Sequence, residues 1–174
     1  MRIAFSGAHR TGKTTLLEAV AARLPGHDAH DEPYWQLEDE GYEFSDPPAR
    51  EDFERQLQLS IESILAGSRD ALFDRSPIDF IAYLQASAGD DFDPDHWSPG
   101  LRDAMEALDA VVLVTIETPD RIAVPSHEDR RLRVAIDEAI TTLLLDDPLG
   151  LGVRTIEVHG DLDARVRQVL RALR

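Results

Sequence analysis

The sequence predicts a single α/β domain of three layers, in which a five-stranded, mainly parallel sheet is covered by helices on both faces. Five short apolar segments alternate along the chain with segments that keep helical spacing. Such alternation is typical of strand–helix–strand units whose strands run parallel. The chain also opens with an apolar segment, a glycine-containing loop and a helical segment in direct succession. Its 174 residues are the length of one ordinary domain, so we expect residues 1–174 to fold as one unit.

The first strand is predicted at residues 2–6, because their apolar run suits a strand buried in a parallel sheet. The residues that follow fit the phosphate-binding pattern G-x-x-x-x-G-K-[ST] without a mismatch; they are Gly7, Ala8, His9, Arg10, Thr11, Gly12, Lys13, Thr14 and Thr15. Glycines in such a loop let successive backbone N–H groups converge on phosphate oxygens at the N-terminus of a helix. We therefore expect these residues to bind a nucleoside triphosphate, ATP being the first choice.

Two side chains of this loop have predicted roles of their own. Lys13 would neutralise the β- and γ-phosphates, and the Thr14 hydroxyl would bind Mg²⁺. Lys13 is the only lysine in a chain whose Lys and Arg residues number 18. A chain that otherwise uses arginine but has lysine here is consistent with a chemical need for lysine.

The next part of the chain leads from the first helix to a second strand end. Leu16, Val20 and Leu24 keep helical spacing, and Pro25-Gly26 ends that helix. Residues 27–33 lead to the end of a second strand, where open α/β sheets bind their ligands. Asp31 and Glu32 lie at this strand end. Residues 38–48 are acidic and irregular and predict a loop, either solvated or acting as a substrate flap.

A second functional anchor follows a predicted packing helix at residues 53–65. A short apolar run ends there in Asp74-Arg75. Ser76, Pro77 and Asp79 then have the order expected for the N-cap, first and third positions of the next helix. The sequence therefore predicts a strand, an Asp-Arg pair and a helix in direct succession.

The second half of the chain continues the alternation. Residues 98–108 predict a helix, and residues 110–116 form the clearest buried strand, which ends at Glu117. A last strand is predicted at residues 153–159 and a last helix at residues 162–173.

A long helix between these strands is expected to start near Ser126 and Asp129, which have capping-box spacing. Its first turns carry three arginines, namely Arg130, Arg131 and Arg133. Each cation near a helix N-terminus opposes the helix dipole by about 0.3–1 kcal/mol. Either Glu128 and Asp129 compensate these charges, or the arginines meet an anion.

Composition narrows the classes of partner. Lys and Arg number 18 against 34 Asp and Glu, a net charge of −16, which disfavours binding to nucleic acid or to anionic membranes. The chain has no cysteine, no apolar run near the ~20 residues of a membrane span, and a strand directly before the phosphate loop. We expect a cytoplasmic protein whose partner is a small molecule or a protein.

With the phosphate loop and Asp74-Arg75-Ser76 in place, the chain resembles the P-loop nucleoside and nucleotide kinases. The resemblance is strongest to small AAA-domain ATPases related to ribosylnicotinamide kinase and more distant to deoxynucleoside kinases. It covers nearly the whole chain and implies the P-loop NTPase fold. The segment Glu32-Pro33-Tyr34-Trp35 is similar to the Glu-Pro segment of deoxynucleoside kinases, where the glutamate takes the proton of the substrate hydroxyl. This implies that Glu32 is the general base, with Asp31 and Asp74 as the alternatives.

The segment Phe73-Asp74-Arg75-Ser76-Pro77 is similar to the acidic-Arg-Ser motif of those kinases. The resemblance implies that Asp74 binds hydrated Mg²⁺ or positions the attacking hydroxyl. It also implies that Arg75 contacts the acceptor or the phosphoryl group in flight. An arginine and a metal suit phosphoryl transfer because its transition state spreads charge over the equatorial oxygens.

Three further assignments come from the same resemblance. The arginines of the long helix fall where these kinases keep a lid, expected here around residues 119–133, with Arg131 as the candidate that meets the phosphates. Arg121 and Gly160-Asp161 resemble the places that flank adenine.

Two hypotheses for the function follow. The first is a kinase that transfers the γ-phosphoryl group of Mg·ATP to a hydroxyl of a small molecule, most naturally a nucleoside-like one. The second is a regulatory ATPase that acts as a switch through a protein partner, with Glu117 orienting the attacking water. Neither the identity of the acceptor nor the oligomeric state follows from the sequence.

Overall fold

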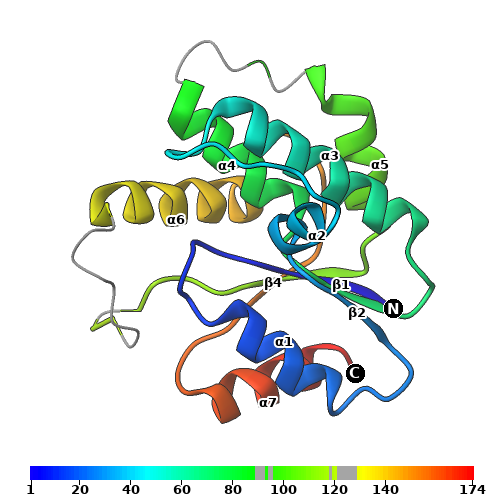
Figure 1. Ribbon diagram of the computed structural model, residues 1–174. Helices are drawn as coiled ribbons and strands as arrows, with labels where there is room; N and C mark the ends of the chain where they lie inside the picture. The colour runs from blue at the N-terminus through cyan, green and yellow to red at the C-terminus, as the bar shows by residue number, and fades with distance from the viewer. Residues whose placement is uncertain (89–92, 94–95, 118, 121–128) are drawn as a thin grey trace.

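The computed structural model describes residues 1–88, 93, 96–117, 119–120 and 129–174. Its centre is a five-stranded sheet of order β2-β3-β1-β4-β5, in which every neighbouring pair runs parallel (Figure 1). The strands are β1 (Arg2–Ser6), β2 (Asp28–His30), β3 (Ala71–Asp74), β4 (Ala110–Leu113) and β5 (Thr155–Glu157). The predicted five-stranded parallel sheet is confirmed.

Helices cover both faces of this sheet. They are α1 (Lys13–Ala21), α2 (Pro33–Asp39), α3 (Arg50–Ala66), α4 (Pro77–Ala88), α5 (Ser98–Glu106), α6 (Arg130–Leu145) and α7 (Leu162–Ala172). Helices α1 and α7 pack against each other below the sheet in the view of Figure 1, whereas α3, α4, α5 and α6 lie above it. The result is the three-layer arrangement that the sequence predicts.

The central strands β1, β3 and β4 are mostly apolar and buried because each side of the sheet has its own core, whereas the edge strands β2 and β5 are partly exposed. Ala4 faces the core formed with α3, α4 and α6, while its neighbours Ile3 and Phe5 face the core formed with α1 and α7. All three side chains are fully buried. Successive residues of a strand point to opposite faces, so a sheet covered on both sides needs apolar residues at every position.

The register of the strands places the functional segments at one edge of the sheet. Phe5 of β1 lies opposite Asp74 of β3, and His30 of β2 lies opposite Phe73. Parallel strands end at the same edge, so the phosphate loop after β1 comes beside Asp74. Glu32 and Arg75, each two residues beyond a matched position, come face to face.

Two elements differ from the prediction. Helix α2 was not expected, because only Pro33 and Leu37 of its seven residues are buried and it leaves little periodic pattern. Helix α6 begins at Arg130, not near Ser126: the Asp129 carboxylate accepts hydrogen bonds from the backbone N–H groups of Arg131 and Leu132 and caps the helix itself. Ser126 and Glu128 lie outside the described residues.

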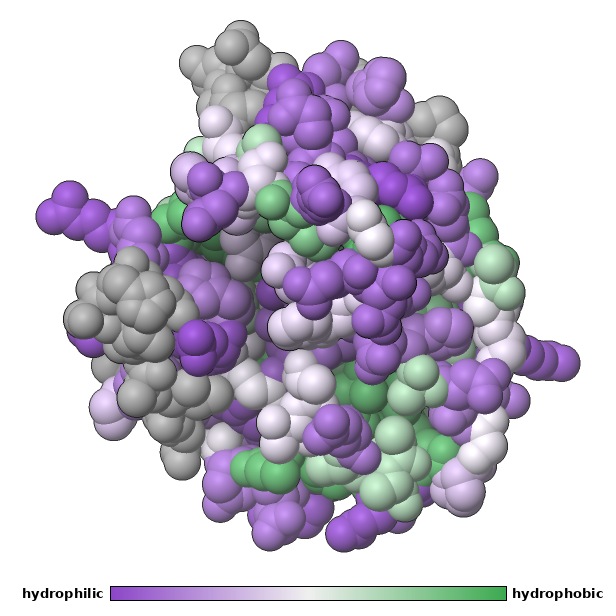
Figure 2. Space-filling model, in the orientation of Figure 1, coloured by the Kyte–Doolittle hydropathy of each residue, from purple (hydrophilic) through white to green (hydrophobic). Residues whose placement is uncertain are grey.

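The surface in this orientation is mostly hydrophilic, as a net charge of −16 requires (Figure 2). Among the residues that the structure describes, no helix combines the length and apolarity needed to cross a bilayer.

Candidate active site

The phosphate loop leaves β1 through a glycine that cannot be replaced. Gly7 has a φ of 152°, and a Cβ built on it would lie 2.1 Å from the carbonyl oxygen of Val114. Its backbone N–H donates to Oδ1 of Asp79 at 3.0 Å. Gly12, with a φ of 87°, then turns the chain directly into α1. Both glycines adopt backbone conformations that other residues rarely reach, which explains their place in the motif.

The loop borders a polar cavity of about 340 Å³ that we call the phosphate cavity. Its lining comes from the loop, from α1 and α2 and from the segments just beyond β2 and β3, namely His9, Arg10, Gly12, Lys13, Thr14, Thr15, Glu32, Tyr34, Trp35 and Arg75. The remaining loop residues, Gly7, Ala8 and Thr11, are buried behind the residues that line this cavity. The structure thus gathers the predicted nucleotide-binding loop around one space.

Lys13 lies buried in this cavity with 5% of its surface exposed. Its Nζ donates to the carbonyl oxygen of Ala8 at 2.9 Å. Burial, reinforced by the positive charge of Arg75, lowers the pKa of Lys13 to about 8. The carboxylates of Asp79, Glu32 and Asp74 offset this effect only in part, so an anion bound in the cavity would further favour the charged form of Lys13.

This lowered pKa predicts a pH dependence of nucleotide binding. Above pH 8 Lys13 is mostly neutral in the free protein, whereas phosphate favours its charged form, so binding must take up a proton. We expect binding to take up most of a proton at about pH 9 and much less at about pH 7. Calorimetric titration of Mg·ATP in two buffers of different ionisation enthalpy measures this number. Equal uptake at both pH values would contradict the assignment.

Thr14 and Asp74, the predicted metal-binding residues, are in direct contact. The Thr14 hydroxyl donates to Oδ2 of Asp74 at 2.5 Å. The other carboxylate oxygen, Oδ1, is buried and has no hydrogen-bond partner among the described residues. Burial raises the pKa of Asp74 above its ordinary value. A buried carboxylate oxygen beside a hydroxyl is a donor set that Mg²⁺ accepts, so these residues fit the predicted ion.

Glu32 and Arg75 form a partly buried ion pair through Oε1 and Nε, in which Arg75 is buried and 21% of the Glu32 side chain is exposed. Burial disfavours the charged form of Glu32, but the positive charges of Arg75 and Lys13 outweigh it and hold the pKa of Glu32 below its ordinary value. Glu32 is therefore a carboxylate at neutral pH. Asp31, by contrast, is exposed and is not among the residues that line the cavities described here.

Arg75 is fixed from several sides. Only 6% of its surface is exposed, its Nη1 donates to Asp79 at 3.2 Å and to the Gly7 carbonyl at 3.3 Å, and its guanidinium lies 5.7 Å from the ring centre of Tyr83. Its φ of 83° is uncommon for a residue with a side chain. Such a conformation persists where the surroundings over-determine it, which is frequent at active sites.

The predicted start of α4 is confirmed and has a further consequence. The Ser76 hydroxyl accepts from the N–H of Ile78, and the Asp79 carboxylate accepts from the N–H of Ser76, so the two residues cap the helix. The same carboxylate also holds Gly7 and Arg75. Asp79 is fully buried and ties the phosphate loop to the Asp-Arg-Ser motif.

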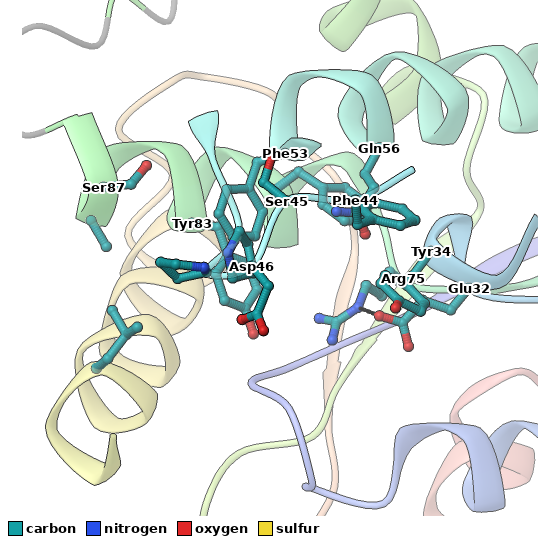
Figure 3. A pocket seen from close by; sticks show the side chains of 15 residues that line it. Glu32, Tyr34, Phe44, Ser45, Asp46, Phe53, Gln56, Arg75, Tyr83 and Ser87 are labelled. Carbon is teal, nitrogen blue, oxygen red and sulfur yellow. Dashed lines mark hydrogen bonds and ion pairs between the residues drawn. The ribbon is translucent and has the colours of Figure 1, made fainter. Parts of the chain in front are cut away.

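A second, larger cavity of about 800 Å³ adjoins the first, and we call it the aromatic cavity (Figure 3). Its rings come from the segment 34–44 and from α3 and α4, namely Tyr34, Phe44, Phe53, Phe80 and Tyr83. Phe53 and Tyr83 are stacked at 5.0 Å with an interplanar angle of 6°. The Gln56 side chain contributes an amide to the same wall. Residues 44–48, within the loop predicted at 38–48, line this cavity as well.

The two cavities share three lining residues, Glu32, Tyr34 and Arg75. Figure 3 shows the Glu32–Arg75 pair at one end of the aromatic cavity and Ser87 at the other. His9 of the phosphate loop also reaches toward this wall, with its Nδ1 3.3 Å from the Tyr83 hydroxyl. The Glu32–Arg75 ion pair therefore lies at the boundary between the phosphate cavity and the aromatic cavity.

The predicted lid arginines are placed differently from one another. Arg131 is exposed on the first turn of α6, and it is not among the described residues lining either cavity. Arg133 is buried, and its guanidinium contacts the phosphate loop and Asp120. Most of the predicted lid, including the whole segment 121–128 with Arg121, lies outside the described residues.

The remaining predicted positions, Glu117, Gly160 and Asp161, make contacts that stabilise the fold. The Gly160 N–H donates to Glu117 at 2.5 Å, and Asp161 caps α7 by accepting from the N–H of Ala164. Glu117 also pairs with Arg165 at 3.1 Å. The carboxylate considered for a water-orienting role is thus held by a buried arginine.

Sequence reasoning missed Asp79 as a site residue and missed the aromatic wall. Asp79 was identified only as a helix cap, and its second role depends on the register that brings β1 and β3 together. Phe53 and Tyr83 keep ordinary helical spacing, so nothing in the sequence separates them from core residues. Arg165 gives no local signal either, since its partners lie far away in the chain.

Comparisons with known proteins agree with this geometry. Residues 2–165 match the family model of an AAA domain. A search among proteins of curated function finds no significant match.

Solved structures with the same fold include several kinases. The NadR protein in complex with NR has a TM-score of 0.66 at 18% identity, covering 99% of this chain and 49% of that one. Deoxyadenosine kinase from M. mycoides with bound dATP has a TM-score of 0.70 at 13% identity, covering 99% of both chains. Shikimate kinase from Aquifex aeolicus has a TM-score of 0.59 at 13% identity, covering 99% and 96%. The chain spans about half the length of NadR, and at these identities the likeness shows the fold alone.

Proposed function

The chain belongs to the AAA domain family and is a P-loop nucleotide-binding domain with the fold of small-molecule kinases, and we propose that it is itself such a kinase. It transfers the γ-phosphoryl group of Mg·ATP to a hydroxyl of a nucleoside-like acceptor. The complexes of NadR with AMP-PNP and of deoxyadenosine kinase with dATP support a nucleotide in this fold.

One observation carries the proposal. The phosphate cavity and the aromatic cavity meet at a partly buried ion pair, Glu32 and Arg75, which lines both. A transferase needs its two substrates side by side with a base and a cation at the junction. A nucleotide switch needs a cavity for the nucleotide, but it does not need a second cavity for an acceptor.

The residues divide the chemistry between them. Glu32, ionised at neutral pH, accepts the proton of the acceptor hydroxyl as the new bond from that oxygen to γ-phosphorus forms. The bond from γ-phosphorus to the bridging oxygen breaks, and ADP leaves with the electron pair. Lys13 and Arg75 stabilise the charge on the transferring group, and Arg131 is the lid residue proposed to join them.

Thr14 and Asp74 are the residues proposed to hold Mg²⁺, Thr14 directly and Asp74 with its partnerless buried oxygen. The ion supplies positive charge to the phosphate oxygens. Asp74 is less suited to act as the base, because the Thr14 hydroxyl already donates to its Oδ2 and its Oδ1 is proposed to face the ion.

The aromatic cavity supports the proposed class of acceptor. Stacked rings favour a flat ring system, since offset stacking and edge contacts between rings add about 0.5–1.5 kcal/mol beyond area burial. The Gln56 side chain is 6% exposed, and its Nε2 donates to the Asp52 carbonyl, which fixes the amide at the cavity wall. An amide can both donate to and accept from the polar edge of a heterocycle. A heterocyclic riboside meets these requirements.

The test is ATP turnover with a panel of hydroxyl compounds. We expect heterocyclic ribosides to raise the turnover well above the rate with no acceptor, and ring-free polyols of similar size to leave it unchanged. Mass spectrometry of the stimulated reactions should find a phosphorylated acceptor. If no compound raises turnover and a protein partner does, the kinase proposal is wrong and the switch hypothesis stands.

A further inference from the structure

Every carbonyl oxygen of the phosphate loop from Gly7 to Thr11 accepts a hydrogen bond from a side chain. Arg75 and Lys13 hold the first two carbonyls, as described above, and Thr11 Oγ1 also donates to Ala8 at 3.0 Å. The last three carbonyls are held by arginines of two helices that are distant in the chain. These two arginines are Arg133 of α6 and Arg165 of α7.

All three nitrogens of the Arg133 guanidinium donate hydrogen bonds. Its Nε donates to the His9 carbonyl and its Nη2 to the Arg10 carbonyl, both at 3.0 Å, while Nη1 pairs with Asp120 at 2.6 Å. The side chain is buried, with 4% of its residue surface exposed. A planar fork that fits two consecutive carbonyls and a carboxylate is a geometry that lysine cannot reproduce.

Arg165 completes the series from the other side of the sheet. Its Nη1 donates to the Thr11 carbonyl at 2.8 Å, and its Nη2 pairs with Glu117 at 3.1 Å. Glu117 in turn accepts from the Gly160 N–H. The two arginines and their two acidic partners surround a small pocket that also includes Arg10 and Thr11, and neither arginine is among the described residues lining the phosphate cavity.

We infer that Arg133 and Arg165 are positioning residues that hold the phosphate loop in its anion-binding form from behind. The C=O and N–H groups on the two sides of a trans peptide bond point in opposite directions. Carbonyls of residues 9–11 that are drawn toward the arginines therefore turn the N–H groups of residues 10–12 the other way, toward the cavity. Asp120 and Glu117 balance the two charges, so the arginines orient the loop without competing with Lys13 for phosphate.

The inference requires only the nucleotide-binding part of the proposed function and not the transfer step. It also gives Arg133 a role other than that of a lid residue that moves onto the phosphoryl group.

The variants Arg133→Lys and Arg165→Lys keep the positive charge of the side chain and remove the planar guanidinium. The matched control is Arg102→Lys, because Arg102 likewise holds two loop carbonyls, those of Leu149 and Gly150, but far from the site.

The experiment measures the affinity for Mg·AMP-PNP by calorimetry, with no acceptor present, in the intact chain. We expect the dissociation constant to rise about tenfold in each of Arg133→Lys and Arg165→Lys, and to stay unchanged in Arg102→Lys. Backbone hydrogen exchange of residues 7–15 in the ligand-free protein should become faster in the first two variants only. Because no acceptor is used, failure of transfer in a kinase assay leaves this result unaffected.

Two results would overturn the inference. Variants that stay folded and bind Mg·AMP-PNP with the wild-type constant would show that the two arginines only stabilise the fold. Unchanged binding together with lost transfer in Arg133→Lys would show that this arginine acts on the transferring group and not on the loop. Faster exchange in residues 7–15 with weakened binding supports the positioning role.

Discussion

We expect replacement of Glu32 with glutamine to lower the rate of phosphoryl transfer by about 10²–10⁴-fold, the usual contribution of a general base. The affinity for Mg·ATP should stay close to that of the wild type, because Lys13 and the backbone of the loop are proposed to hold the phosphates. Pre-steady-state transfer assays together with calorimetry measure the two quantities separately. The substitution removes the proton acceptor and keeps the shape of the side chain.

The neighbouring carboxylate provides the control for this prediction. Asp31→Asn changes the same charge one residue earlier, on an exposed side chain, and we expect it to leave transfer unchanged. Glu32→Asp keeps the carboxylate and should recover part of the lost rate. If Glu32→Gln transfers at the wild-type rate, the base is Asp31 or Asp74, and the assignment of Glu32 is wrong.

Replacing Lys13 with methionine weakens Mg·ATP binding by at least about 100-fold. Hydrogen bonds to charged groups contribute about 1.5–3 kcal/mol each, and Lys13 is expected to contact two phosphates. The methionine side chain keeps most of the buried volume. Calorimetric titration with Mg·ATP measures the loss.

The stability of this variant separates lost binding from lost folding. Burial lowers the pKa of Lys13 to about 8, so below that pH its charge in the folded state destabilises the protein relative to the unfolded chain. Removing the charge should leave the melting temperature of the ligand-free protein unchanged or raise it. Arg23→Met, which removes an exposed charge just beyond α1, should alter neither quantity. Wild-type affinity in Lys13→Met would contradict the placement of the phosphates.

The fold was largely predictable because its signals are local. Apolar runs marked the buried strands, and the glycine loop before α1 fixed the position of β1. The exceptions have physical reasons: α2 is short and buries only two residues, and α6 is capped by Asp129, a residue that the pattern had placed inside the helix.

The site was predictable only where one segment carries the chemistry. The phosphate loop and the Asp74-Arg75-Ser76 motif are contiguous, and the structure brings both to one edge of the sheet with Glu32. Asp79, Arg133 and Arg165 act on the loop across separations of 72, 124 and 154 residues. Such contacts depend on strand register and helix packing, which no local pattern records.

With a net charge of −16, binding of an anion such as ATP depends on how the few cations are arranged locally. An acidic protein repels ATP at long range, although salt screens this repulsion beyond about 8 Å at physiological ionic strength. We therefore expect recognition to depend on Lys13, on Arg75 and on the N–H groups at the start of α1. Their contacts with phosphate would be charge-assisted and partly buried, where screening is weak.

Transfer of label from γ-labelled ATP is the direct test of the proposed phosphoryl transfer to a riboside hydroxyl. The wild-type protein is incubated with γ-³²P-ATP, Mg²⁺ and a mixture of heterocyclic ribosides, and the products are separated. We expect label to accumulate in a phosphate monoester of a riboside, and Glu32→Gln to form this product far more slowly. Label found only in inorganic phosphate, at the same rate with and without ribosides, would contradict the proposed kinase.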